Sequence, residues 1–85
     1  MNDSVQHDGH TVLRDAIVEA RRRASLTQAQ LAERLQVSQQ AYARIETCNR
    51  KVGAVELVVI SRVLGIDVID LMRRVEQATP ADERF

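Results

Sequence analysis

Three polar side chains at positions 39, 40 and 44 have the spacing of residues on one side of a short helix. Gln39, Gln40 and Arg44 face outward together with Ala43, because the apolar residues between them form the opposite, inward stripe. That inward stripe consists of Val37, Ala41, Tyr42 and Ile45. A glutamine amide can bond adenine bidentately, and an arginine guanidinium can bond guanine in the same way. The pattern predicts a face that reads base edges; the alternative is a polar face that only meets solvent.

Two helix caps position this face. Thr27 and Gln30 have the spacing of a capping box, and Ser38 fits the N-cap of a helix over residues 39–46. Only residues 36–37 remain for the turn, so the two helices are expected to cross steeply. This is the geometry that places a second helix in a DNA major groove.

The rest of the chain predicts three further helices, over residues 11–24, 54–64 and 68–77. Thr11 is expected to cap the first of them, Gly65 to close the second and Asp67 to cap the third. No segment has the alternation of a strand. We therefore expect an all-α, compact five-helix domain over residues 11–77, between a disordered tail (1–10) and a flexible tail (78–85).

The charge of the chain is zero in sum but uneven along its length. Residues 14–51 hold eight Lys/Arg and four Asp/Glu, a net charge of +4, and each flank has a net charge of −2. A basic centre favours a polyanionic partner, although ordinary solvated helix surface is the alternative. Only two aromatic residues occur, which argues against the stacking platforms that bind RNA or single strands.

Several other classes of protein are disfavoured. The longest apolar run, residues 57–60, is too short for a membrane span, and residues 1–10 are too polar for a signal peptide. No nucleophile has a base beside it and no glycine loop could cradle a phosphate, so we expect neither an enzyme nor a cofactor.

The candidate metal ligands near the N-terminus and the single thiol do not predict a functional site. His7, Asp8 and His10 lack a fourth ligand nearby, so no metal site is expected. The single cysteine, Cys48, excludes an internal disulfide and suits the cytoplasm. An oxidation sensor at Cys48 is the weaker alternative to an ordinary loop thiol.

Four segments carry a resemblance to a known family: residues 26–32, 37–40, 44–46 and 64–67. In this order and spacing, residues 13–72 resemble the XRE family of helix-turn-helix DNA-binding domains, which includes Cro and the phage repressors. The resemblance implies a fold of the phage-repressor type and a dimeric transcriptional regulator. Gln36 and Cys48 depart from the family, which favours glycine there, so left-handed backbone is expected at both.

The resemblance also implies roles for single residues. In similar repressors the positions of Gln39, Gln40 and Arg44 reach base edges, while those of Gln28 and Ser38 hold phosphates. Arg50 and Lys51 follow the second helix of the motif and could grip the flanking backbone.

A buried ion pair is expected between Arg21 and Glu46. Both residues point partly inward, Arg21 four positions after Ile17 and Glu46 four positions after Tyr42. A buried charge needs a partner, and the family has an ion pair at the matching positions. The predicted role is structural.

The last two helices carry more apolar residues than one core face requires. In the helix over residues 54–64, Leu57, Ile60 and Leu64 are expected to pack inward. In and before the helix over residues 68–77, Ile66, Ile69 and Met72 are expected to do the same. Six apolar residues then remain outside. These six, predicted to form a dimer interface, are Val55, Val59, Val63, Val68, Leu71 and Val75. The alternative is that they widen the core of a monomer.

Together these patterns predict a cytoplasmic, bacterial- or phage-type regulator, acting mainly as a repressor, that binds a palindromic double-stranded DNA operator as a homodimer. The competing interpretation is a protein-interaction module, such as an antitoxin-like partner of another protein.

Overall fold

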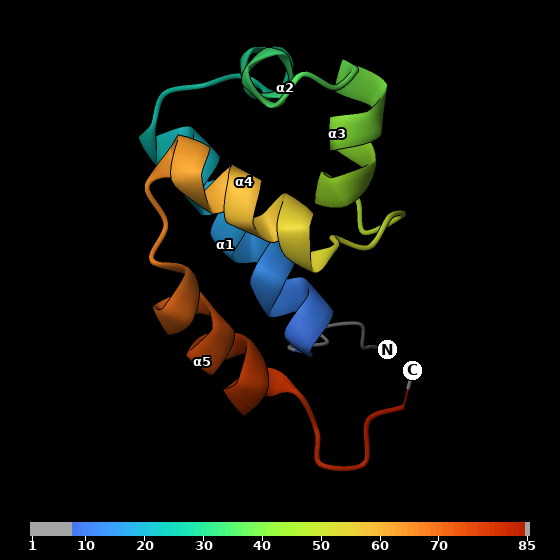
Figure 1. Cartoon of the computed structure of the whole chain (residues 1–85). Helices are drawn as coiled ribbons and strands as arrows, with labels where there is room; N and C mark the ends of the chain where they lie inside the picture. The colour runs from blue at the N-terminus through green and yellow to red at the C-terminus, as the bar shows by residue number, and fades with distance from the viewer. Residues whose placement is uncertain (1–7, 85) are drawn as a thin grey trace.

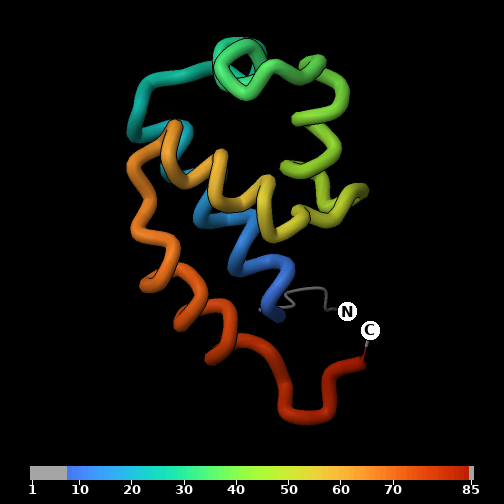
Figure 2. Tube along the Cα trace, in the orientation of Figure 1, coloured from blue at the N-terminus to red at the C-terminus, as the bar shows by residue number. Residues whose placement is uncertain are grey.

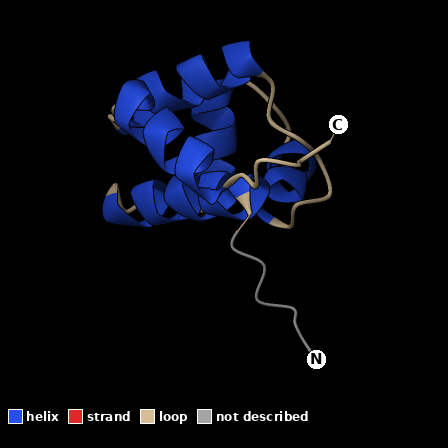
Figure 3. Ribbon diagram, turned by 90° about the horizontal axis from the view of Figure 1, so that it is seen from below, coloured by secondary structure: helices blue, strands red, loops and turns tan. Residues whose placement is uncertain are grey.

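The computed structural model describes residues 8–84, and its regular structure there is entirely helical (Figures 1 and 3). The helices are α1 (Gly9–Arg23), α2 (Gln28–Leu35), α3 (Gln39–Glu46), α4 (Ala54–Leu64) and α5 (Val68–Ala78). The predicted all-α, five-helix fold is confirmed. In the trace of Figure 2, α1 and α4 occupy the middle, with α2 and α3 on one side and α5 on the other.

The predicted caps of α2 and α5 are present. The Thr27 hydroxyl accepts a hydrogen bond from the Gln30 N–H at 3.0 Å, and the Gln30 side chain accepts one from the Thr27 N–H at 2.8 Å. One carboxylate oxygen of Asp67 accepts from two backbone N–H groups of α5 at 3.1 Å each. Gly65 ends α4 in the left-handed region with φ of 71°. These caps fix where the helices begin and end.

The start of α1 differs from the prediction. Asp8, not Thr11, is the N-cap: its carboxylate accepts a hydrogen bond from the Thr11 N–H at 2.9 Å, and this bond lowers the pKa of Asp8. The helix therefore begins at Gly9, and the prediction of a disordered tail is wrong for residues 8–10. The rest of that tail, including the candidate metal ligand His7, lies outside the described residues. The first turn of α1 lacks the apolar periodicity on which the prediction depended.

Every helix contributes to one hydrophobic core. Its buried members are Ala16, Ile17, Leu26, Leu31, Ala32, Tyr42, Ile45, Leu57, Ile60 and Leu71. None of the described helices combines the length and the apolar character that a bilayer span requires.

The inward face of α5 is the reverse of the predicted one. Leu71 is only 1% exposed, and Val68 and Val75 pack against the core, whereas Ile69 and Met72 are exposed. The helix has apolar residues on both sides, so periodicity alone does not choose between them. α5 packs along α1, and its Val75 lies beside the unpredicted first turn, where a Cβ at Gly9 would be 3.3 Å from the Val75 side chain. The three α5 residues predicted as dimer contacts are therefore core residues.

The outward face of α4 agrees with the prediction only in part. Val55 is 78% exposed and Val59 is also exposed, as expected for residues that the core does not need. Val63 differs, because it is half-buried and packs against the core. Val58 joins the exposed face although no role was predicted for it. An apolar surface thus remains on α4.

Replacement of Leu71 by alanine should lower the free energy of unfolding by about 2–5 kcal/mol, because it leaves a cavity between α1 and α5. Urea denaturation measures this. The matched control Ile69→Ala, at an exposed site on the same helix, should change the free energy by less than about 0.5 kcal/mol. Equal losses for the two variants would contradict the assignment of the buried face.

Ser61 of α4 is buried, and its hydroxyl has no hydrogen-bond partner among the described residues. An unpaired buried hydroxyl destabilises the folded state. We expect Ser61→Ala to raise the free energy of unfolding by about 1 kcal/mol in the same denaturation experiment, since alanine also favours the helix more than serine does. A loss of stability would show that the hydroxyl is bonded in solution.

Candidate nucleic-acid interface

The turn between α2 and α3 sets the direction of α3. Gln36 adopts a left-handed conformation with φ of 61°, and its N–H and that of Val37 donate to carbonyl oxygens in the last turn of α2. Figure 1 shows α2 end-on and α3 from the side, so the two helices cross steeply. The left-handed conformations expected at Gln36 and at Cys48, with φ of 61° at each, are confirmed. Each costs a non-glycine residue about 1 kcal/mol.

α3 has one buried side and one polar, exposed side. The Ser38 hydroxyl caps it by accepting a hydrogen bond from the Ala41 N–H at 3.1 Å. Tyr42 and Ile45 are buried. The outward residues predicted to meet DNA are Gln39, Gln40, Ala43 and Arg44; all are exposed except Ala43, which is half-buried. The helix therefore presents the polar face that the sequence predicts.

Val37 does not lie in the inward stripe of α3. Its side chain is 46% exposed, although the periodicity predicts it to be buried. The residue belongs to the turn, because it follows the left-handed Gln36 and precedes the Ser38 cap. Helical periodicity therefore does not apply to it.

The predicted Arg21–Glu46 ion pair is confirmed, and it joins α1 to the end of α3. The Arg21 guanidinium donates to both carboxylate oxygens, from Nε at 2.7 Å and from Nη2 at 3.1 Å. The two side chains are only 11% and 8% exposed. Arg21 also donates through Nη1 to the Leu26 carbonyl oxygen at 2.8 Å, which fixes the connection between α1 and α2.

Two further side chains bond the same carboxylate. The Tyr42 hydroxyl donates to Glu46 Oε2, and the Gln28 amide donates to Oε1 at 2.7 Å. The Arg14 guanidinium donates to the Glu46 backbone carbonyl at 2.9 Å. Sequence reasoning missed these three contacts, although the i,i+4 spacing of Tyr42 and Glu46 on one helix is a signal for the first.

The surroundings of Glu46 favour its charged form. Burial raises the pKa of Glu46, but the hydrogen bonds from Arg21, Tyr42 and Gln28 outweigh it, so the pKa lies below its ordinary value of 4.5. Burial and the bond to Glu46 raise the pKa of the Tyr42 hydroxyl, which therefore remains a donor. The hydrogen bonds to Glu46 also raise the pKa of Arg21.

Two predicted phosphate contacts are bonded to carboxylates within the folded protein. Gln28 is half-buried at the start of α2 and donates its amide to Glu46. Arg50 donates to Glu56 through both terminal nitrogens, from Nη1 at 3.1 Å. Lys51 is exposed and has no acidic oxygen within 4.0 Å in the described part of the chain. Of the two bases after α3, only Lys51 is thus unengaged among the described residues.

Ion pairs within the protein engage half of the bases of the basic centre, residues 14–51. Four of its eight bases are in ion pairs: Arg14 with Asp15, Arg21 with Glu46, Arg23 with Glu19 and Arg50 with Glu56. Among the described residues, the four bases without such a pair are Arg22, Arg34, Arg44 and Lys51. Arg44 therefore supplies the positive charge of α3 itself.

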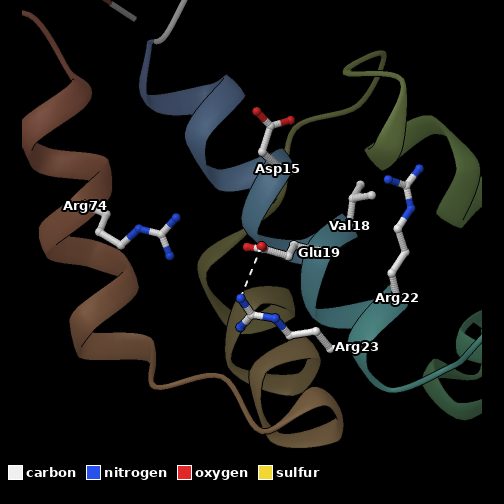
Figure 4. A pocket seen from close by; sticks show the side chains of 6 residues that line it. All are labelled: Asp15, Val18, Glu19, Arg22, Arg23 and Arg74. Atoms are coloured by element: carbon white, nitrogen blue, oxygen red, sulfur yellow. Dashed lines mark hydrogen bonds and ion pairs between the residues drawn. The ribbon is translucent and has the colours of Figure 1, made fainter.

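A second group of charges lies in a hollow of about 630 Å³ between α1 and α5 (Figure 4). Arg23 donates to Glu19 at 3.2 Å, and Figure 4 shows that Arg74 of α5 points toward the same carboxylate. The hollow contains both signs of charge, with Asp15 and Arg22 also on its wall, and no residue of α3 lines it. It is therefore not part of the α3 face.

Replacement of Glu46 by alanine should lower the free energy of unfolding by about 3–5 kcal/mol, because it leaves the buried Arg21 charge without its partner. Urea denaturation at neutral pH measures this loss. The control Glu33→Ala removes an exposed acid from α2 and should change stability by less than about 0.5 kcal/mol. An unchanged unfolding midpoint for Glu46→Ala would refute the structural role of the pair.

The same network predicts how stability depends on pH. Because folding lowers the pKa of Glu46, its stabilising contribution is present above pH 4.5 and is lost as the pH falls through the folded-state pKa. The difference in stability between wild type and Glu46→Gln should therefore shrink between pH 7 and about pH 3. A difference that grows on acidification would contradict a lowered pKa.

Comparison with known proteins agrees with this geometry. A helix-turn-helix family of the XRE/Cro type matches residues 17–71, about two thirds of the chain, and the matched stretch contains α2, α3 and both partners of the Arg21–Glu46 pair. No curated protein and no solved structure matches the chain. Domains of this family bind DNA and are typically non-catalytic. The chain thus belongs to the XRE/Cro-type helix-turn-helix family of DNA-binding domains.

Proposed function

We propose that the protein is a transcriptional regulator that binds a palindromic DNA operator as a homodimer. The observation that carries this proposal is the polar, exposed face of α3, opposite a face that Tyr42, Ile45 and Glu46 anchor in the core. A helix held in this way can enter the major groove without bending. In a two-fold dimer, two such helices would meet half-sites about one DNA turn, ~34 Å, apart.

Each residue of the interface has a proposed role. Gln39, Gln40 and Arg44 read base edges, and Ala43 offers an apolar contact to a thymine methyl group. The Ser38 hydroxyl accepts a bond at the cap of α3 and can still donate its proton to a phosphate. Lys51 contacts the backbone of the flanking DNA.

Gln28 and Arg50 are weaker candidates for phosphate contacts than the sequence predicts. Each donates to a carboxylate in the free protein, so a phosphate must compete with Glu46 or Glu56 for the same donor. A second amide hydrogen of Gln28 is still available for such a contact.

Repression is the proposed mode of action, because a dimer bound over a promoter excludes polymerase. The proposed location is the cytoplasm, where a bacterial- or phage-type regulator meets its DNA. Neither a catalytic step nor a cofactor takes part in it.

An antitoxin-like interaction module is the second candidate. The observation that favours it is the exposed pair Ile69 and Met72 on α5, which could contact another protein. The two candidates differ in their dependence on salt. A DNA-binding protein should lose affinity steeply, with a logarithmic slope of about −0.9 per neutralised phosphate, whereas a module that binds only protein should show no operator preference.

Gln40→Ala and Arg44→Ala should each weaken binding to the selected operator by about 5- to 150-fold, which corresponds to the loss of one bidentate base contact. Fluorescence anisotropy with a labelled duplex measures this. Both variants should keep the unfolding midpoint of wild type, since both side chains are exposed.

The matched control is Gln77→Ala, which removes an exposed glutamine from α5. It should leave the affinity unchanged. If Gln40→Ala and Arg44→Ala bind the operator as tightly as this control does, α3 is not the reading helix.

A further inference from the structure

The hydrophobic core opens to the surface in a groove between α3 and α4. The groove has a volume of about 210 Å³, and buried residues, among them Tyr42, Ile45 and Ile60, form its floor. Val37, Val55 and Val59 are three exposed aliphatic residues on its walls. A small domain with exposed apolar walls around an open groove has the features of an interaction surface.

We infer that this groove is the dimer contact, and that Val55 of a second copy fills it. The inference rests on the proposed function, since it names the surface through which two operator-binding chains pair. Val55 is the most exposed of the large apolar residues in the described part of the chain and lies beside the groove, at the start of α4. A projecting side chain and a hole on one patch make that patch complementary to itself across a two-fold axis.

The charges beside the groove also complement a second copy. Arg50 and Glu56 line the groove and are paired with each other, while their side chains remain 40% and 43% exposed. Across a two-fold axis, the Arg50 of each chain can face Glu56 of the other. Each charge of the patch then faces an opposite charge on the second copy. A neutral apolar partner would cover this ion pair without offering either residue an opposite charge of its own.

The spacing of two half-sites favours this face over α5. Half of one DNA turn is about 17 Å, so the two-fold axis must pass at about that distance from α3. The groove is bordered by α3 itself, so a contact there keeps the two-fold axis closer to α3 than a contact through α5 does. The difference arises because α1 lies between α3 and α5 (Figure 1).

Sedimentation equilibrium of Val55→Glu tests the inference. Wild type should be a dimer, and the variant should be a monomer with an unchanged unfolding midpoint, because the side chain is exposed and a carboxylate near a helix N-terminus is favourable. The matched control is Ile69→Glu, which introduces the same charge at the equivalent second position of α5 and should remain a dimer. A dimeric Val55→Glu, or a monomeric Ile69→Glu, would overturn the inference.

A charge exchange provides a second test that does not depend on Val55. Arg50→Glu and Glu56→Arg should each dimerise more weakly, because each brings like charges together, and a mixture of the two should form heterodimers with both contacts attractive. Mass spectrometry of the mixture under native conditions would detect them. If the mixture pairs no better than either variant alone, the charges do not face each other.

DNA binding separates failure of this inference from failure of the proposed function. Val55→Glu should bind a single half-site as wild type does, and lose about 10²-fold or more in affinity for the full palindrome. Equal affinity of wild type and Val55→Glu for the palindrome would overturn the inference. Absence of any duplex binding by wild type would overturn the proposed function, while sedimentation would still report on the interface.

Discussion

The Glu46 carboxylate accepts hydrogen bonds from side chains of three helices: Arg21 from α1, Gln28 from α2 and Tyr42 from α3. A charge that is almost fully buried is stable only when its partners are fixed around it. Because those partners come from three helices, the carboxylate defines how these helices are placed relative to one another. The backbone of Glu46 adds a fourth contact, through the bond that Arg14 donates to its carbonyl.

The direction of α3 follows from this network and from the turn before it. The left-handed Gln36 directs the chain out of α2, the Ser38 cap starts α3, and Glu46 ties its last turn to α1. A helix of eight residues is thus held at both ends. Its outward side chains take no part in the core, so their types can vary without loss of the fold.

Local signals in the sequence predict much of the fold. The capping box at Thr27, the Ser38 cap and the glycine at position 65 depend on neighbouring residues alone, and each is confirmed. The Arg21–Glu46 pair is confirmed for a related reason, because an inward charge on each of two helices must find a partner.

The wrong predictions concern residues whose surroundings depend on segments that are distant in the sequence. α5 has apolar residues on two sides, and its buried side packs along α1, whose first turn the sequence pattern placed in a tail. Val37 lies in a turn where helical periodicity fails. The carboxylate partners of Gln28 and Arg50 are likewise set by tertiary structure.

The central claim is that the exposed side of α3 reads bases in duplex DNA. Selection of bound duplexes from a random pool, followed by sequencing, tests it most directly. The account predicts an enriched palindrome whose half-sites contain adenine and guanine at the positions facing Gln39, Gln40 and Arg44, with centres about one helical turn apart. A pool that remains random after repeated selection would contradict the claim.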